Sequence, residues 1–307
     1  MVSTTEHIDH GGNALAFARA LGVDHRDILD LSASLNPFAP DLRDIVISSV
    51  DEITRYPDED PAHHALASAL GVDPNRLVLT NGGAEAIALV ATVEKHGHVP
   101  RPTFSLYERH LQTIDPDGPL WRSNPSTPLG RLADPRETAH VWDEAFWPLA
   151  TGTWSRGDAD AWRLGSLTKL WACPGVRIGY VIAPDEDRAV LVRRIRPRWA
   201  LSAVALRVVQ EGLPLTDLSA WARAIRRSRD QLVELFRSRD LTVVDTDANW
   251  VLVDSPQLGE HLRSAKILVR SCESFGMPGW FRVAIPRPDD VDRLSSAVDS
   301  FVGTSAS

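Results

Sequence analysis

The sequence predicts an α/β protein in which a large domain built on a mostly parallel sheet is followed by a smaller α+β domain. Short apolar runs at 77–80, 139–145, 162–167 and 178–183 alternate with segments of helical periodicity. That alternation is typical of parallel sheets, whose strands need helical crossover connections. Beyond residue 240, short strand-like runs follow one another closely, which indicates a second and smaller unit.

The predicted strands and helices follow one another along the chain in an order that agrees with this fold. Strand 77–80 passes through two glycines into a helix at 84–96, and the other strands of the large sheet come next. Helical periodicity then dominates from residue 186 to residue 236, with breaks at Pro197 and at 212–214. The small unit has strands at 241–246, 249–254, 267–272 and 281–286, a helix at 258–265 and a closing helix after Pro288.

The length of the chain suits this division. A chain of 307 residues can form one large and one small domain. We place the large domain at 46–195. A linker helix and the small C-terminal domain would occupy 196–307. Residues 1–45 are expected to form an N-terminal segment that packs on the small domain.

Charge and cysteine content exclude several classes of protein. The formal charge of −8 argues against binding to nucleic acid. Cys173 and Cys272 are too few and too isolated for a disulfide framework or a metal site, and they favour a reducing, cytoplasmic compartment. No uninterrupted apolar run is long enough for a membrane span, and the N-terminus lacks the pattern of a signal peptide.

The run 165-GSLTKLWACPGVRIGYV-181 carries the first candidate chemistry. The amine of Lys169 can condense with an aldehyde to form a Schiff base. Ser166, Thr168 and Arg177 can hold a phosphate dianion nearby. The alternative is a surface lysine in a loop, with an arginine that has only a structural role.

Two further runs carry groups that suit the same ligand. In 80-TNGGAEAI-87, Gly82 and Gly83 form a tight turn into a helix, whose free N–H groups and dipole favour a phosphate. In 140-HVWDEAF-146, Asp143 ends a strand and can face the nitrogen of a pyridine ring. Taken singly, the first run is an ordinary turn and Asp143 an ordinary helix N-cap.

The order of these motifs resembles a fold type I enzyme dependent on pyridoxal 5'-phosphate, of the class I and II aminotransferase superfamily. The runs 10-HGGN-13, 30-DLSASLNPFAP-40, 55-RYPDED-60 and 270-RSCESFGMPGWFRVAI-285 extend the resemblance over nearly the whole chain. The nearest branch is that of histidinol-phosphate aminotransferases and threonine-phosphate decarboxylase-like proteins of cobalamin biosynthesis. The resemblance implies the aspartate aminotransferase fold.

The resemblance also implies a role for individual residues. Lys169 would form the Schiff base, Asp143 would face the pyridine nitrogen, and Phe104 would stack on the cofactor ring. The phosphate would be held by Gly82, Gly83, Ser166, Thr168 and Arg177. Tyr56 would reach the phosphate bound in the other subunit, which implies a homodimer. The substrate carboxylate would bind Arg282, in a cleft also lined by Asn36, Asn249 and His10.

The chain departs from these relatives at several positions. Thr127 stands where they have an asparagine that donates to the phenolic oxygen of the cofactor, and Asn124 lies three residues too early. Phe146 replaces a tyrosine that often supplies a second donor. The stretch between Tyr107 and Asn124 is shorter by roughly one helix and one strand.

These departures lead to a prediction about the Schiff base. With both donors to the phenolic oxygen weakened, the imine should hold its proton more tightly than in relatives. We expect an absorbance titration of the purified protein to give a raised imine pKa. An ordinary, low value would contradict this expectation.

The resemblance leaves the reaction open. Decarboxylation of L-threonine O-3-phosphate is favoured by the N- and C-terminal runs, and transamination of the histidinol-phosphate type is the alternative. Both reactions need a carbanion at the α-carbon of a small amino acid, stabilised by the cofactor ring. A degenerate homologue without turnover is the third possibility, because Thr127 and the shortened centre depart from the family pattern.

Overall fold

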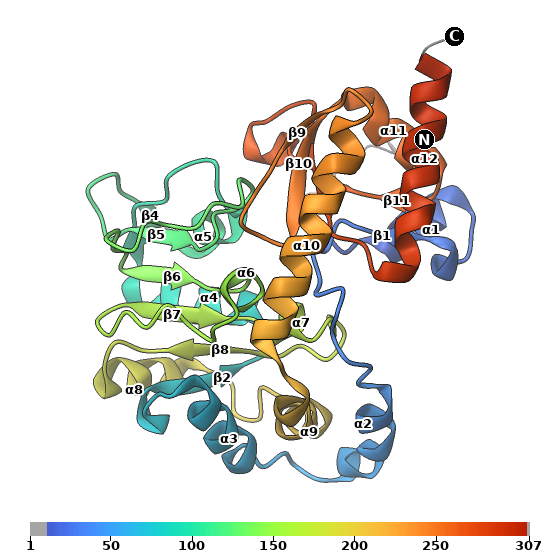
Figure 1. Ribbon diagram of the computed structural model, residues 1–307. Coiled ribbons are helices and arrows are strands. Elements are labelled where there is room, and N and C mark those ends of the chain that lie inside the picture. The colour runs from blue at the N-terminus through green and yellow to red at the C-terminus, as the bar shows by residue number, and fades with distance from the viewer. Residues whose placement is uncertain (1–10, 306–307) are drawn as a thin grey trace, which may run out of the picture.

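The long helix α10 (Leu218–Arg237) runs between a larger and a smaller part of the molecule in the computed structural model, which describes residues 11–305 (Figure 1). The larger part contains a five-stranded sheet and the helices that cover it. The smaller part contains a four-stranded sheet together with the C-terminal helix. No helix among the described residues is long and apolar enough to cross a bilayer.

The large sheet has the strand order β2-β8-β7-β6-β5. Its strands are β2 (Leu77–Thr80), β5 (Trp121–Ser123), β6 (Val141–Asp143), β7 (Trp162–Gly165) and β8 (Gly179–Ile182). The β5–β6 and β6–β7 pairs are parallel, while β8 runs antiparallel to both of its neighbours. The strands β2, β5, β6 and β7 thus all run in the same direction, and β8 runs in the opposite one. The prediction of an α/β fold with a mostly parallel sheet is confirmed.

Alternating side chains let this sheet form two cores, as the period of a β-strand requires. On one face, Val78 and Val181 pack with α4 (Gly83–Glu94) and α8 (Glu186–Ile195). On the other face, Leu77 and Leu79 pack with α3 (Asp60–Leu70) and α9 (Ala203–Gly212). The predicted helical region 186–236 consists of three helices, α8, α9 and α10. They are separated at the two predicted breaks, around Pro197, which cannot continue a helix, and around 212–214.

The small sheet is antiparallel and has the order β12-β13-β10-β9. Its strands are β9 (Thr242–Val244), β10 (Trp250–Asp254), β12 (Arg270–Ser271) and β13 (Trp280–Ala284), and its helices are α11 (Pro256–Ser264) and α12 (Val291–Ser305). The N-terminal segment contributes α1 (Ala14–Leu21) and β1 (Leu29–Asp30), and β1 pairs in parallel with β11 (Ile267–Leu268). Next in the chain, α2 (Arg43–Ser48) packs near α9. The division at residues 45 and 195 stays a prediction.

The centre of the chain is where regular structure is sparse. The two-residue strands β3 (His96–Gly97) and β4 (Thr113–Ile114) form a separate parallel pair, and α5 (Ser105–His110) lies between them in sequence. The parallel connection from β5 to β6 contains no helix, although such connections usually do. Irregular chain therefore covers the sheet beside β6, followed by the short helix α6 (Trp147–Thr151).

Candidate active site

Lys169 lies in the short helix α7 (Leu167–Leu170), which begins directly after β7 ends. Its Nζ donates a hydrogen bond of 2.9 Å to the carbonyl oxygen of Ala33, so the N-terminal segment closes over the end of the large sheet. Nζ also lies 5.7 Å from the centre of the Phe146 ring. Burial, and then the charge of Arg282, lower the pKa of Lys169 to about 8.

Asp143 is the last residue of β6, and the alternation of the strand directs its side chain to the face covered by α4 and α5. The hydroxyl of Tyr107 donates to its Oδ2 at 2.7 Å, and the amide of Ala145 donates to its Oδ1 at 3.0 Å. Burial raises the pKa of Asp143, while these two hydrogen bonds and the charge of Lys169 oppose the rise. Tyr107 was not identified from the sequence, although it lies three residues after Phe104, which caps the same helix.

The two residues offered for the phenolic oxygen of the cofactor differ in their surroundings. Thr127 is buried, and its backbone amide donates to the Ser123 hydroxyl at 2.8 Å. Asn124 is also buried, and its Oδ1 accepts a 3.0 Å hydrogen bond from the amide of Ala133. The Nδ2 of Asn124 has no hydrogen-bond partner among the described residues. Asn124 is therefore anchored through its oxygen while its donor stays unused.

The predicted phosphate ligands gather at the start of α4. Gly82 caps this helix with a positive φ of 84°, which glycine adopts without strain. A Cβ built on Gly82 would lie 2.3 Å from Nη2 of Arg177, and one built on Gly83 would touch Ser166. Free helical N–H groups, a guanidinium and a hydroxyl thus converge on one place, as an anion requires.

Two predicted residues are engaged in holding the loop around Lys169. The hydroxyl of Thr168 donates to the carbonyl of Ile178 at 3.2 Å, so it braces the end of β8. Asn36 donates through Nδ2 to the carbonyl of Leu170 at 2.9 Å and accepts at Oδ1 from the amide of Phe38. Their proposed contacts with phosphate and substrate stay predictions. Phe104 lies half-buried at the start of α5, with its ring edge-on to Tyr107.

The small sheet brings Arg282 and Asn249 close to the N-terminal segment. Arg282 is buried, and its Nη2 donates to the carbonyl of Ser32 at 3.4 Å. Asn249 donates to the carbonyl of Ser34 at 2.8 Å, and its Oδ1 is buried without a partner among the described residues. Burial lowers the pKa of Arg282 to about 10, which leaves it charged at neutral pH.

Arg270 is a second arginine of this region that the sequence reasoning did not assign. It pairs directly with Arg282 across β12 and β13, so both side chains share one face of the small sheet. Arg270 is also buried, and its Nη2 donates to Ser274 at 2.7 Å. Its position inside the quoted run 270–285 was visible in the sequence, but the strand register was not.

Two predicted residues are not brought to this site. Tyr56 is 78% exposed and stacks on Trp199, with 4.4 Å between the ring centres. This position agrees with a role toward a second subunit but does not test it. His10 lies outside the residues that the structure describes.

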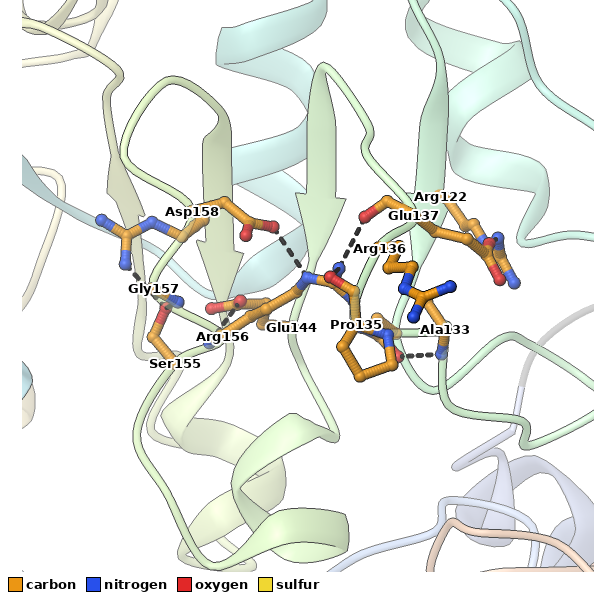
Figure 2. A network of polar contacts seen from close by, with 12 residues as sticks. Arg122, Ala133, Pro135, Arg136, Glu137, Glu144, Ser155, Arg156, Gly157 and Asp158 are labelled. Atoms are coloured by element: carbon orange, nitrogen blue, oxygen red, sulfur yellow. Dashed lines mark hydrogen bonds and ion pairs between the residues drawn. The ribbon is translucent and has the colours of Figure 1, made fainter.

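A network of charged and polar groups surrounds Glu144, the residue after Asp143, and links it to 155–158 and to the β5–β6 connection (Figure 2). Glu144 accepts at Oε1 from the backbone amide of Arg156 at 2.9 Å, and its Oε2 has no partner in the described part of the chain. The Arg156 side chain stacks on Trp142 and donates to the carbonyl of Glu137 at 2.5 Å, and its Nε faces Asp158. This network holds the irregular β5–β6 connection where a crossover helix would otherwise pack.

Glu144 should make the stability of the protein depend on pH. Burial raises its pKa to about 7, although Ser155, the Arg156 amide and the Arg163 charge favour the ionised form. Because the folded state holds this proton more tightly than the unfolded state, the stabilisation is present at low pH and is lost as the pH rises through 7. Glu144→Gln should therefore raise the free energy of unfolding at pH 8 by about 3 kcal/mol, the value of such a pKa difference, and by less than about 1 kcal/mol at pH 5.

Chemical denaturation at both pH values measures this effect. The exposed Glu234→Gln change on α10 is the control and should behave alike at pH 5 and pH 8. Equal stability changes at the two pH values in Glu144→Gln would contradict the prediction.

The arrangement as a whole fits pyridoxal phosphate. The glycine turn leaves the start of α4 open beside Arg177, where a phosphate fits. Lys169 offers an amine of lowered pKa for an aldehyde, and Asp143 offers a buried carboxylate for a ring nitrogen. All of these side chains belong to loops and strand ends at the carboxyl edge of β6 and β7, which is where open α/β sheets bind ligands.

Known proteins are similar to this chain over nearly its whole length. A threonine-phosphate decarboxylase from Salmonella typhimurium is 29% identical over 94% of this chain and 95% of its own length. Histidinol-phosphate aminotransferase 1 from Dechloromonas aromatica is 25% identical over 92% of each chain. The solved structure of histidinol-phosphate aminotransferase from Sinorhizobium meliloti, in complex with pyridoxal-5'-phosphate, has a TM-score of 0.80 at 16% identity and covers 95% of this chain and 94% of its own.

The structural similarity shows the fold, which the sequence predicted. The family follows from the sequence itself, since residues 115–298 match the family model described as aminotransferase class I and II. That match covers more than half of the chain and includes Asp143, Lys169, Arg177 and Arg282. The chain therefore belongs to the aminotransferase class I and II family.

Proposed function

We propose that this protein is a pyridoxal-phosphate enzyme that decarboxylates a small phosphorylated amino acid of the L-threonine O-3-phosphate type. The observation that carries the proposal is the pair of buried arginines, Arg270 and Arg282, on one face of the small sheet. Two adjacent guanidinium groups suit a substrate with two anionic groups, here a carboxylate and a phosphate. The similarity to a threonine-phosphate decarboxylase supports the same substrate class.

Some residues of the site would act on the cofactor and others on the substrate. When bound, pyridoxal phosphate supplies an electron sink for the pair of electrons left at the α-carbon. Asp143, held by Tyr107, would keep a proton on the ring nitrogen. Arg282 would orient the carboxylate, and the amine of Lys169, with its lowered pKa, would return a proton to the α-carbon.

The alternative reaction is transamination of the histidinol-phosphate type. The similarity to a histidinol-phosphate aminotransferase supports it, and the arginine pair would also suit 2-oxoglutarate, which has two carboxylates. A degenerate homologue without turnover remains the third proposal. It is supported by Thr127 and by the missing crossover helix between β5 and β6.

Product analysis separates these proposals. The purified protein is incubated with L-threonine O-3-phosphate, and in parallel with histidinol phosphate and 2-oxoglutarate. Carbon dioxide from the first mixture is expected. Glutamate from the second mixture without carbon dioxide from the first would establish the aminotransferase instead, and neither product would favour the degenerate homologue.

A homodimer is part of the proposal. Exposed apolar side chains occur together on α2, on the turn that follows it and at the Tyr56–Trp199 pair: Ile47, Val50, Ile53, Tyr56 and Trp199. Contiguous exposed apolar surface favours association with another protein surface, and symmetric pairing is the commonest oligomeric state. Sedimentation of the purified protein as a dimer is expected.

A cytoplasmic location also remains a proposal, supported by two free cysteines.

A further inference from the structure

Arg282 is a buried cation without an acidic partner in the described part of the chain. Its Nε makes no hydrogen bond to any described residue, and its Nη2 has only the long contact to Ser32. The neighbouring charge of Arg270 repels it. A buried guanidinium in these surroundings is costly unless another group compensates for the lost water.

The compensating group is the indole ring of Trp250. The guanidinium carbon of Arg282 lies 4.6 Å from the centre of this ring. The strand register explains the contact: Leu252 is directly opposite Arg282 and Trp250 is two residues away on the same face, so the pair is diagonal. A guanidinium over the face of a tryptophan is attracted by the ring, and the attraction is strongest where water is excluded.

An aromatic partner has a consequence that a carboxylate would not have. A carboxylate would occupy the donor edge of the guanidinium and would neutralise its charge. The face of an indole offers no carboxylate oxygen to the guanidinium, so this contact leaves the N–H groups of Arg282 available to another anion. The ring therefore stabilises the positive charge of Arg282 and leaves its N–H groups available to bind an anion.

Trp250 is itself held in place by parts of the candidate site. Its Nε1 donates to the carbonyl of Pro128 at 2.9 Å, next to Thr127. Its ring also meets the edge of Phe146, with 4.8 Å between the ring centres, and Phe146 lies beside the amine of Lys169. One fully buried side chain thus contacts Arg282, the loop of Thr127 and the ring beside Lys169.

We propose that Trp250 is a positioning residue: its ring holds the Arg282 guanidinium in place without an acidic partner, so that the guanidinium N–H groups can receive the α-carboxylate of the substrate. The inference rests on the proposed function because it assumes an amino-acid substrate. It adds a residue to which neither the family motifs nor the sequence reasoning gave a role. Trp250 acts through Arg282 and is not a catalytic residue.

Two variants and two controls test the proposal. Trp250→Leu removes the aromatic face, and Trp250→Phe keeps a face while it removes the hydrogen bond to Pro128. Trp162 is an equally buried tryptophan whose Nε1 donates to Glu94 at 2.8 Å, and it belongs to β7 of the large sheet, whereas Arg282 belongs to the small sheet. Trp162→Leu and Trp162→Phe therefore report what the loss of any buried indole does to the protein.

Binding is measured by calorimetry on the holoenzyme after borohydride reduction, which prevents turnover. The probes are L-threonine O-3-phosphate and the same phosphorylated amine without its carboxylate. The preference is the ratio of the affinities for the first and the second probe. In Trp250→Leu this ratio is expected to fall about tenfold, as the loss of a desolvated cation–π contact implies. Trp250→Phe should retain most of that preference, and both Trp162 variants should retain all of it.

Steady-state kinetics and crystal structures complete the test. In Trp250→Leu, KM should rise by about tenfold with a smaller change in kcat, because ground-state positioning is lost. An unchanged preference with an unmoved guanidinium in the crystal structure of Trp250→Leu would overturn the inference. If the parental protein binds neither probe, the proposed substrate is wrong. The position of the guanidinium in that variant then decides the inference, and displacement from its parental position supports it.

Discussion

Replacing Lys169 with alanine is expected to remove the visible absorbance of the purified protein and to lower its turnover by about 10³-fold or more, the range for loss of a group that transfers protons. The amine is the group whose pKa the site has lowered, to about 8. The parental protein should be yellow and should lose its visible band on treatment with borohydride. A Lys169→Ala variant that looks like the parent would contradict the central assignment.

The sequence offers sharp controls for this experiment. Its other lysines are Lys95, which is exposed, and Lys266, which pairs with Asp27 at 3.2 Å. Lys95→Ala and Lys266→Ala should keep both the colour and the turnover. Peptide mapping of the reduced parental protein should find the added mass on Lys169 alone.

The lowered pKa of Lys169 gives the same experiment a dependence on pH. Burial disfavours the ammonium form, so the free amine, which reacts with an aldehyde, becomes abundant as the pH rises through about 8. Uptake of pyridoxal phosphate by the apoprotein should therefore accelerate up to this pH and then level off. Arg282→Gln removes a charge that lowers this pKa, so its uptake curve should move to higher pH.

The parts of the site that could be predicted from the sequence are local. A glycine turn into a helix and a lysine just beyond a strand each depend on a few neighbouring residues, and both have the predicted backbone setting. The strand alternation likewise assigns Asp143 and Glu144 to opposite faces once β6 is known. The roles of these residues toward the cofactor stay predictions.

The parts that could not be predicted depend on contacts between distant segments. Arg270 meets Arg282 only through the register of β12 and β13, and register is set by the whole sheet. Thr168 could be identified by its position, but the partner of its hydroxyl, Ile178, could not. The sequence predicts that roughly one helix and one strand are missing between Tyr107 and Asn124, whereas the connection without a helix that the structure shows is the β5–β6 connection, which follows Asn124.

The contact between Tyr107 and Asp143 leads to the second prediction with a large effect. Asp143→Asn should lower turnover by roughly 30-fold, since a hydrogen bond to a charged group contributes about 2 kcal/mol. The asparagine keeps the shape of the side chain but cannot hold the ring nitrogen in its protonated form. Steady-state turnover of the holoenzyme measures the effect, and a loss of less than threefold would argue against the assigned role.

Tyr107→Phe tests the same carboxylate from the other side. The Tyr107 hydroxyl opposes the rise in the pKa of Asp143 that burial causes, so its removal should raise this pKa further. Asp143 then ionises only at higher pH, and the acidic limb of the pH–rate profile should shift to higher pH. Tyr180→Phe, which removes a buried hydroxyl on the other face of the sheet, should leave that limb in place. Equal pH–rate profiles for Tyr107→Phe and the parent would contradict this prediction. They would mean that contacts other than the Tyr107 hydroxyl keep Asp143 ionised despite its burial.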